Sequence, residues 1–303
     1  MTGFSRDWLR LRESADLAAR DPGLARRFAA ALPRRPGKAL RLIDLGAGTA
    51  ATCRALMPRL GGDQDWLLLD HDPSLLAAQV EEMTLWARRQ GYPILAGGGR
   101  ITLTAGAACW QVTGRALDLA RDWAVLETLE ADGVTASALF DLVSADWVER
   151  LVAWLERRGL PLFAMLTADG QRLWEPPLSG DEQVAAGFRL HQGSDKGFGA
   201  ALGGGAPAVL ARALSARGFE VEQAASDWRL GAGDAMLLAE LIAGEAEAAA
   251  AARPLDKSVI EGWETGRRQL LDNGRLKLAI GHRDILALPG KTAKIAARNR
   301  GGR

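Results

Sequence analysis

The residues of this 303-residue chain that are best suited to chemistry surround a glycine turn. Residues 42–50 read LIDLGAGTA, so Asp44 stands two positions before Gly46 and four before Gly48. Glycines allow the backbone N–H groups at the start of a helix to approach a polar ligand closely. Asp70 ends the next apolar run, where a carboxylate can accept hydrogen bonds from ribose hydroxyls. The spacing predicts a turn that binds a nucleotide cofactor.

The elements that must position this turn alternate between apolar runs and amphipathic segments. A mostly apolar run at 39–45 precedes the turn, and a helix is expected after it at 52–60. This alternation favours an α/β fold with a doubly wound, mostly parallel sheet. Further strands are expected at 65–70, 101–104, 110–117, 134–138, 160–167, 219–224 and 276–288. Further helices are expected at 6–32 with a break near Pro22, and at 73–90, 123–130, 146–155, 208–217 and 232–271.

Changes in composition divide the chain into three expected parts. Residues 1–38 are expected to form a helical cap, residues 39–290 the α/β domain, and residues 291–303 a basic, flexible tail. Within the domain, residues 168–207 interrupt the alternation. We expect a long irregular, lid-like insertion there, because such segments in compact domains often cover binding sites.

Charge and cysteine content exclude several classes of function. Lys and Arg number 38 and Asp and Glu number 37, so the formal net charge of +1 makes a nucleic-acid partner unlikely. Cys53 and Cys109 belong to no CxxC or Cys/His cluster, which argues against a zinc site or a disulfide framework. No run approaches the roughly 18 apolar residues of a membrane-spanning helix. A cytoplasmic protein with a small-molecule partner and no bound metal is expected, with the oligomeric state left open.

The glycine turn fits two cofactors. Gly46, Gly48 and Ala51 satisfy the relaxed dinucleotide pattern and Asp70 lies about 20 residues further on, which would suit a nicotinamide-dependent oxidoreductase. Asp44 argues against that interpretation, because its carboxylate would repel a pyrophosphate but could pair with the cationic amino-acid end of a different ligand. An adenine amino group would also find an acceptor at the acid that ends the third buried strand, in the pair Asp118 and Leu119.

Together these motifs resemble the class I S-adenosylmethionine-dependent methyltransferases. The first motif of that family is an acid-x-Gly-x-Gly turn, matched here by Asp44, Gly46 and Gly48, with Ala50 in place of the common third glycine. The resemblance covers residues 39–167 well and the later strands more loosely. It implies a seven-stranded Rossmann-like sheet whose last strand, here 276–288, is antiparallel. It also implies S-adenosylmethionine as the cofactor.

The resemblance transfers cofactor-binding roles to particular positions. Asp118 could instead end its strand through ordinary turn propensity, and Asp72 before Pro73 is better explained as a helix N-cap than as a ligand. The implied cofactor-binding residues are Asp44, Gly46, Ala47, Gly48, Asp70, His71, Asp118, Leu119 and Ser137.

Methyl transfer requires mainly that donor and nucleophile be held in line, and a base is needed only for a protonated nucleophile. Such a base should lie near the carboxyl ends of the strands. His191 and Asp195, within the expected insertion, are the predicted catalytic residues, although His191 could equally be an ordinary surface histidine. A nicotinamide-dependent oxidoreductase and a non-catalytic S-adenosylmethionine-binding protein remain as alternatives.

Other charged residues have an ordinary structural explanation as well. Arg12, Asp16 and Arg20 recur every four residues in the cap, which fits a helix face that covers the cofactor but also a solvated face with ion pairs. His282, inside the last expected strand, is better explained by a structural role than by catalysis.

Overall fold

The computed structural model describes residues 4–252 and 257–290; the tail expected at 291–303 lies outside this range. The described residues form one ten-stranded sheet in the order β3-β4-β5-β2-β1-β6-β7-β10-β8, with β9 paired to β10. The strands are β1 Leu40–Leu45, β2 Gln64–Asp70, β3 Ile94–Gly97, β4 Arg100–Ala105, β5 Ala108–Ala116, β6 Gly133–Ser137, β7 Leu162–Glu175, β8 Phe219–Ala225, β9 Trp228–Leu230 and β10 Lys277–Pro289.

Seven of these strands have the predicted arrangement. Strands β5, β2, β1, β6 and β7 are mutually parallel neighbours, whereas β10 is antiparallel to both β7 and β8. The expected doubly wound α/β sheet with an antiparallel last strand is therefore confirmed. Strand β4, expected at 101–104, pairs antiparallel with β5, and the structure adds β3 beside β4 and β9 beside β10.

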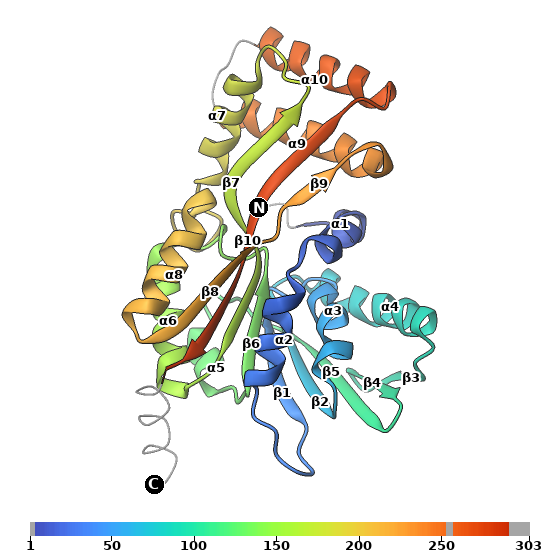
Figure 1. The fold of residues 1–303 in the computed structure, drawn as a ribbon, viewed down its shortest axis with the longest axis vertical. Helices are drawn as coiled ribbons and strands as arrows, with labels where there is room; N and C mark the ends of the chain where they lie inside the picture. The colour runs from blue at the N-terminus through green and yellow to red at the C-terminus, as the bar shows by residue number, and fades with distance from the viewer. Residues whose placement is uncertain (1–3, 253–256, 291–303) are drawn as a thin grey trace.

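Helices cover both faces of the sheet (Figure 1). One core lies between the sheet and α5, α6 and α8, and a second lies between the sheet and α2, α3 and α4. Ile43 belongs to the first core and Leu42 to the second, because successive residues of a strand point to opposite faces. The helices are α1 Arg6–Ala19, α2 Pro22–Ala31, α3 Ala51–Leu60, α4 Pro73–Gln90, α5 Trp123–Thr128, α6 Ala145–Arg158, α7 Asp181–Gln192, α8 Ala206–Ala216, α9 Ala235–Ala252 and α10 Lys257–Asp272.

Strands β7 and β10 continue past the carboxyl edge of the parallel strands into a second layer (Figure 1). There they join β9, and α7, α9 and α10 lie with them in a separate apolar core that includes Trp174 and Trp263. Arg267 is fully buried in this upper layer, where it pairs with Asp181 and lies over both tryptophan rings. The upper layer therefore has its own packed centre above the edge where the parallel strands end.

The irregular structure expected across 168–207 is wrong for much of that segment. Residues 168–175 continue β7, with Leu173 paired to Ala279 and Trp174 to Leu278, and α7 follows them. The strand pattern is weak here because Gly170 interrupts it, with a φ of +82° and the backbone of Gly204 packed against it. The extended pairing depends on β10, a partner more than a hundred positions later in the chain.

Helix α1 lies where the lower sheet meets the upper layer (Figure 1). Ser5 caps its N-terminus by accepting a hydrogen bond from the backbone N–H of Trp8, and Asp21 caps α2 in the same way. Pro22 occupies the first position of α2, so the predicted break between two N-terminal helices is confirmed. No helix in the described part of the chain is both long and apolar enough to cross a lipid bilayer.

Candidate functional site

The glycine turn between β1 and α3 has a left-handed backbone at alternate positions. The φ angles of Gly46, Gly48 and Ala50 are +65°, +51° and +69°. Glycine adopts this region freely, whereas a left-handed alanine is strained by about 1–2 kcal/mol. The N–H of Ala47 donates to the carbonyl of Leu69 at 2.9 Å, which ties the turn to the end of β2. The turn leads directly into the N-terminus of α3, where backbone N–H groups without a partner in the helix can donate to a polar ligand.

Asp44 lies near the carboxyl end of β1 and its side chain is buried. One carboxylate oxygen, Oδ1, accepts a 2.7 Å hydrogen bond from the hydroxyl of Thr135 on the neighbouring strand β6. The other, Oδ2, is shielded from solvent and has no hydrogen-bond partner. Burial raises the pKa of Asp44 to about 7, although the Thr135 hydrogen bond and the charge of Arg20 both act to lower it. The carboxylate has an unused acceptor beside the glycine turn.

Asp70 ends β2 and braces the turn. Its Oδ2 accepts a hydrogen bond from the N–H of Gly48 at 2.8 Å, and its Oδ1 accepts from the N–H of Asp72 at 2.9 Å. His71 next to it is largely exposed, with Nδ1 3.5 Å from the same carboxylate. Asp72 is the N-cap of α4, as expected from its position before Pro73. The structure brings Asp70 directly to the glycine turn.

Asp118 and Leu119 follow β5, in the turn that leads to α5. The carboxylate of Asp118 accepts hydrogen bonds from the N–H groups of Ala120 and Arg121, so it stabilises this turn. Leu119 is buried, and its carbonyl accepts a 2.8 Å hydrogen bond from the indole of Trp147 on α6. Because the N–H of Leu117 bonds to the carbonyl of Asp70, the Asp118 turn begins beside the end of β2.

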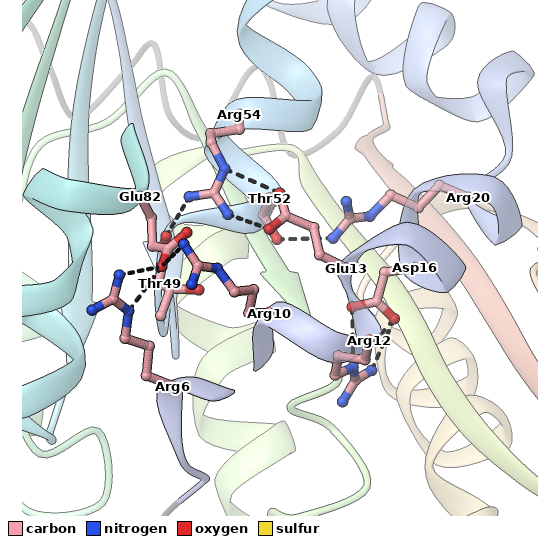
Figure 2. Close-up of polar contacts among 10 residues, drawn as sticks. All are labelled: Arg6, Arg10, Arg12, Glu13, Asp16, Arg20, Thr49, Thr52, Arg54 and Glu82. Carbon is pink, nitrogen blue, oxygen red and sulfur yellow. Dashed lines mark hydrogen bonds and ion pairs between the residues drawn. The ribbon is translucent and has the colours of Figure 1, made fainter. Parts of the chain in front are cut away.

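Helix α1 covers the glycine turn, and side chains from α3 and α4 hold it there (Figure 2). A Cβ atom added to Gly48 would lie 3.0 Å from the Leu9 side chain, so α1 contacts the turn directly. Glu13 pairs with Arg54 of α3 at 2.7 Å, and Glu82 of α4 pairs with Arg6 at the same distance. The cap expected from the sequence thus packs on the predicted cofactor turn.

The face of α1 that carries Arg12, Asp16 and Arg20 is not solvated. Asp16 is buried, and Arg12 binds it through both Nε and Nη2 while lying 4.8 Å from the centre of the Trp228 ring. At the C-terminus of α1, Nη2 of Arg20 donates to the hydroxyl of Ser137 at 3.3 Å. Sequence periodicity alone could not separate this arrangement from a solvated face, because both show the same four-residue spacing.

His191 lies on α7 in the upper layer. Partial burial and the neighbouring charge of Lys196 lower the pKa of its imidazole. Its backbone carbonyl accepts a 3.0 Å hydrogen bond from the Lys196 ammonium. No hydrogen bond or ion pair within residues 4–252 and 257–290 joins the His191 side chain to the glycine turn, so its catalytic role stays a prediction.

Asp195 closes a tight turn after α7. Its Oδ1 accepts hydrogen bonds from the backbone N–H groups of Gly197 and Gly199, at 2.6 and 3.0 Å. Phe198 in the same turn packs edge-on against Trp147, with ring centroids 5.6 Å apart. The glycine-rich segment therefore lies against Trp147, whose indole also bonds to the carbonyl of Leu119, and a catalytic role for Asp195 stays a prediction.

A further acid near the site was not singled out from the sequence. Asp141 lies in the loop after β6, two residues beyond Leu139, which packs against Gly46. Its Oδ1 is shielded from solvent and has no hydrogen-bond partner, and burial raises its pKa against the opposing charge of Arg12. The signal that could have identified it is an acid just after the carboxyl end of a predicted strand, where a base was expected.

The strand order and the glycine turn define the class of the fold. A sheet ordered β5-β2-β1-β6-β7-β10-β8, with β10 antiparallel and a glycine turn after β1, is the class I methyltransferase fold.

Comparison with solved structures agrees with this class. The chain is similar to a cyclopropane-fatty-acyl-phospholipid synthase-like protein from Lactobacillus casei, with 12% identity, coverage of 94% of each chain and a TM-score of 0.50. It is also similar to the cyclopropane synthase MmaA2 from Mycobacterium tuberculosis, with 13% identity, coverage of 94% of each chain and a TM-score of 0.48. At 12% identity the similarity to the Lactobacillus casei protein establishes the fold alone. No family model and no curated protein sequence matches the chain.

Proposed function

We propose that this protein is an S-adenosylmethionine-dependent methyltransferase that acts on a small molecule. The observation that carries the proposal is the unpartnered Oδ2 of Asp44 beside the left-handed glycine turn. A buried acceptor without a partner is costly unless a ligand supplies the missing donor. The α-ammonium group of S-adenosylmethionine is such a donor, whereas the pyrophosphate of NAD would bring a second negative charge to the same place.

The other residues of the turn support the same ligand. Asp70 lies where the ribose hydroxyls would need an acceptor, next to Gly48. The turn formed by Asp118 and Leu119 begins beside the end of β2, so it would lie next to the adenine ring of a ligand whose ribose is bound by Asp70. We assign cofactor binding to these residues together with Gly46, Ala47, His71 and Ser137.

The small size of the acceptor is supported by charge. The near-zero net charge provides no field that would attract nucleic acid. A groove of about 420 Å³ lies between α1 and β9, but its wall contains none of the residues assigned to cofactor binding, so we do not assign it to the acceptor.

The bound cofactor would supply an activated methyl group on its sulfonium sulfur. The chain's task is then to orient the nucleophile and to take its proton where it carries one. Asp141 suits the second task, because its Oδ1 is free, its pKa is raised by burial, and its loop contacts the glycine turn through Leu139. His191 and Asp195 remain alternative proton acceptors.

Isothermal titration of the purified protein tests the cofactor. We expect binding of S-adenosylhomocysteine and no binding of NAD⁺ or NADH; the reverse result would overturn the proposal. Incubation with methyl-labelled S-adenosylmethionine and a small-metabolite fraction then tests the activity. Labelled product is expected in that fraction, and its absence despite tight cofactor binding would instead indicate a non-catalytic binding protein.

A further inference from the structure

Arg20 at the C-terminus of α1 is a shielded cation without a counter-ion. Within the described residues no carboxylate oxygen lies within 4.0 Å of its guanidinium nitrogens. Its Nε is inaccessible to solvent and has no hydrogen-bond partner. Its Nη2 makes only long hydrogen bonds, to the hydroxyl of Thr52 at 3.4 Å (Figure 2) and to the hydroxyl of Ser137 at 3.3 Å. Burial lowers the pKa of Arg20, as expected for a cation withdrawn from water.

Two of the three acids around Arg20 accept hydrogen bonds from other donors at both carboxylate oxygens. Asp16 binds the guanidinium of Arg12 and also accepts from the indole of Trp228 at 3.1 Å. Asp284 accepts from two backbone N–H groups, those of Leu166 and Asp21, at 2.9 and 2.8 Å. Of the three carboxylates whose charges reach Arg20, only that of Asp44 has an oxygen shielded from solvent and free of hydrogen bonds.

Arg20 and Asp44 are anchored on one face of β6. Thr135 donates to Asp44, and Ser137, two residues along the same strand, accepts from Arg20. Side chains two residues apart in a strand point to the same face and are separated by roughly 7 Å. A cation and an anion are therefore held side by side, each with an unused polar atom, without pairing to each other. An α-amino acid group carries the complementary pair of charges on adjacent atoms.

We propose that Arg20 and Asp44 together bind the zwitterionic amino-acid end of the ligand, with Arg20 taking the α-carboxylate and Asp44 the α-ammonium. The proposal rests on the proposed function and adds to it a binding residue outside the glycine turn, on the helix that covers the turn. It also makes α1 part of the binding site, because the carboxylate would join α1 to the sheet through Arg20. Ser137 and Thr52 then position the guanidinium.

Three neutral thioethers that differ only in the substituent on sulfur separate the two charges. S-adenosylhomocysteine has both charged groups, decarboxylated S-adenosylhomocysteine has the ammonium alone, and 5′-methylthioadenosine has neither. We would titrate each by calorimetry into the full-length protein and into the variants Arg20→Met and Asp44→Asn. Arg10→Met is the matched control, since Arg10 lies on the same helix but is half exposed and pairs with Glu82.

The Arg20→Met variant should bind S-adenosylhomocysteine about 10- to 100-fold more weakly, the loss expected for a charge-assisted hydrogen bond, and should bind the two other ligands as the wild type does. Asp44→Asn should weaken the binding of S-adenosylhomocysteine and of decarboxylated S-adenosylhomocysteine but not that of 5′-methylthioadenosine. Arg20→Lys should restore part of the loss, because the charge is kept. Arg10→Met should bind all three ligands normally.

Each contrary outcome has a distinct meaning. If Arg20→Met weakened all three ligands equally, Arg20 would be a structural residue and the proposal would be overturned. The proposal would also be overturned if Arg20→Met bound S-adenosylhomocysteine as tightly as the wild type, although the proposed function would stand. If the wild type bound none of the three ligands, the proposed function itself would be lost. Thermal unfolding of each free variant identifies any that has failed to fold.

Discussion

Cofactor affinity should depend on pH through Asp44. Its carboxylate is buried and its pKa is raised to about 7, so near neutral pH about half of the free protein carries a protonated Asp44. A ligand ammonium group would pair with the ionised form alone. Binding should therefore release a proton and strengthen as the pH rises toward 7.

The size of the effect follows from this pKa. If only ionised Asp44 binds, the apparent affinity for S-adenosylhomocysteine should rise roughly fiftyfold between pH 5 and pH 7, then level off. Arg20 and Asp70 are the charged groups that act on Asp44, and the Cys53 thiol beside it stays neutral because burial raises its pKa well above the usual value. Calorimetry in two buffers with different ionisation enthalpies would give both the affinity and the number of protons released.

The sign for stability is opposite to that for affinity. A carboxyl whose folded pKa is raised from 3.8 to about 7 stabilises the fold below pH 4, and this contribution is lost as the pH rises to 7. The shift corresponds to on the order of 4 kcal/mol. Asp44→Asn should therefore flatten both profiles and leave the free protein more stable at pH 8. A wild-type affinity that does not change between pH 5 and pH 7 would refute the assignment of Asp44 as the ammonium partner.

Three other substitutions test separate parts of the structure. Gly48→Ala should lower the free energy of unfolding by about 1–3 kcal/mol, because the residue has a φ of +51° and the new Cβ would lie 3.0 Å from the Leu9 side chain. Urea denaturation measures this loss, and an unchanged midpoint would contradict the strain in the turn. Arg267→Ala should cost about 2–5 kcal/mol, because it removes a fully buried side chain that packs on Trp174 and Trp263 and pairs with the partly exposed Asp181; a loss below 1 kcal/mol in urea denaturation would contradict this packing. Asp141→Asn should reduce methyl transfer to the metabolite fraction by about 10²- to 10⁴-fold with cofactor affinity unchanged, and wild-type transfer would remove Asp141 as the proton acceptor.

The parts of the site that the sequence predicted are those with local signals. The turn at Gly46 and Gly48 needs particular residue types at fixed spacing, and Asp70 lies at the tip of the next strand of the same βαβ unit. Such features depend on a few neighbouring residues, so they can be predicted from the sequence before the fold is known. The break before Pro22 and the cap at Asp72 are of the same kind, because each is determined by one residue and its immediate neighbours.

The parts that were missed depend on contacts between distant residues. The extension of β7 beyond residue 168 exists because β10 pairs with it. The residues of this segment contain no local sequence pattern that predicts the pairing. The proposed role of Arg20 likewise depends on its hydrogen bond to Ser137, which lies on β6 more than a hundred positions further along the chain. A helical repeat identifies which residues share a face, but the surface that this face meets is determined by the whole fold.

The two long strands also determine how the site can open. Strands β7 and β10 both run from the lower sheet into the upper layer, and their pairing shifts register twice on the way, between Ile280 and His282 and between Arg283 and Ile285. A hinge between the two layers would still have to break backbone hydrogen bonds between these strands. Within residues 4–252 and 257–290, no backbone hydrogen bond joins α1 to the sheet, and the side chains of Leu9, Glu13 and Arg6 contact the glycine turn, α3 and α4. We therefore expect a ligand to enter and leave by movement of α1 over a rigid frame, with amide hydrogen exchange faster in α1 than in the strands below it.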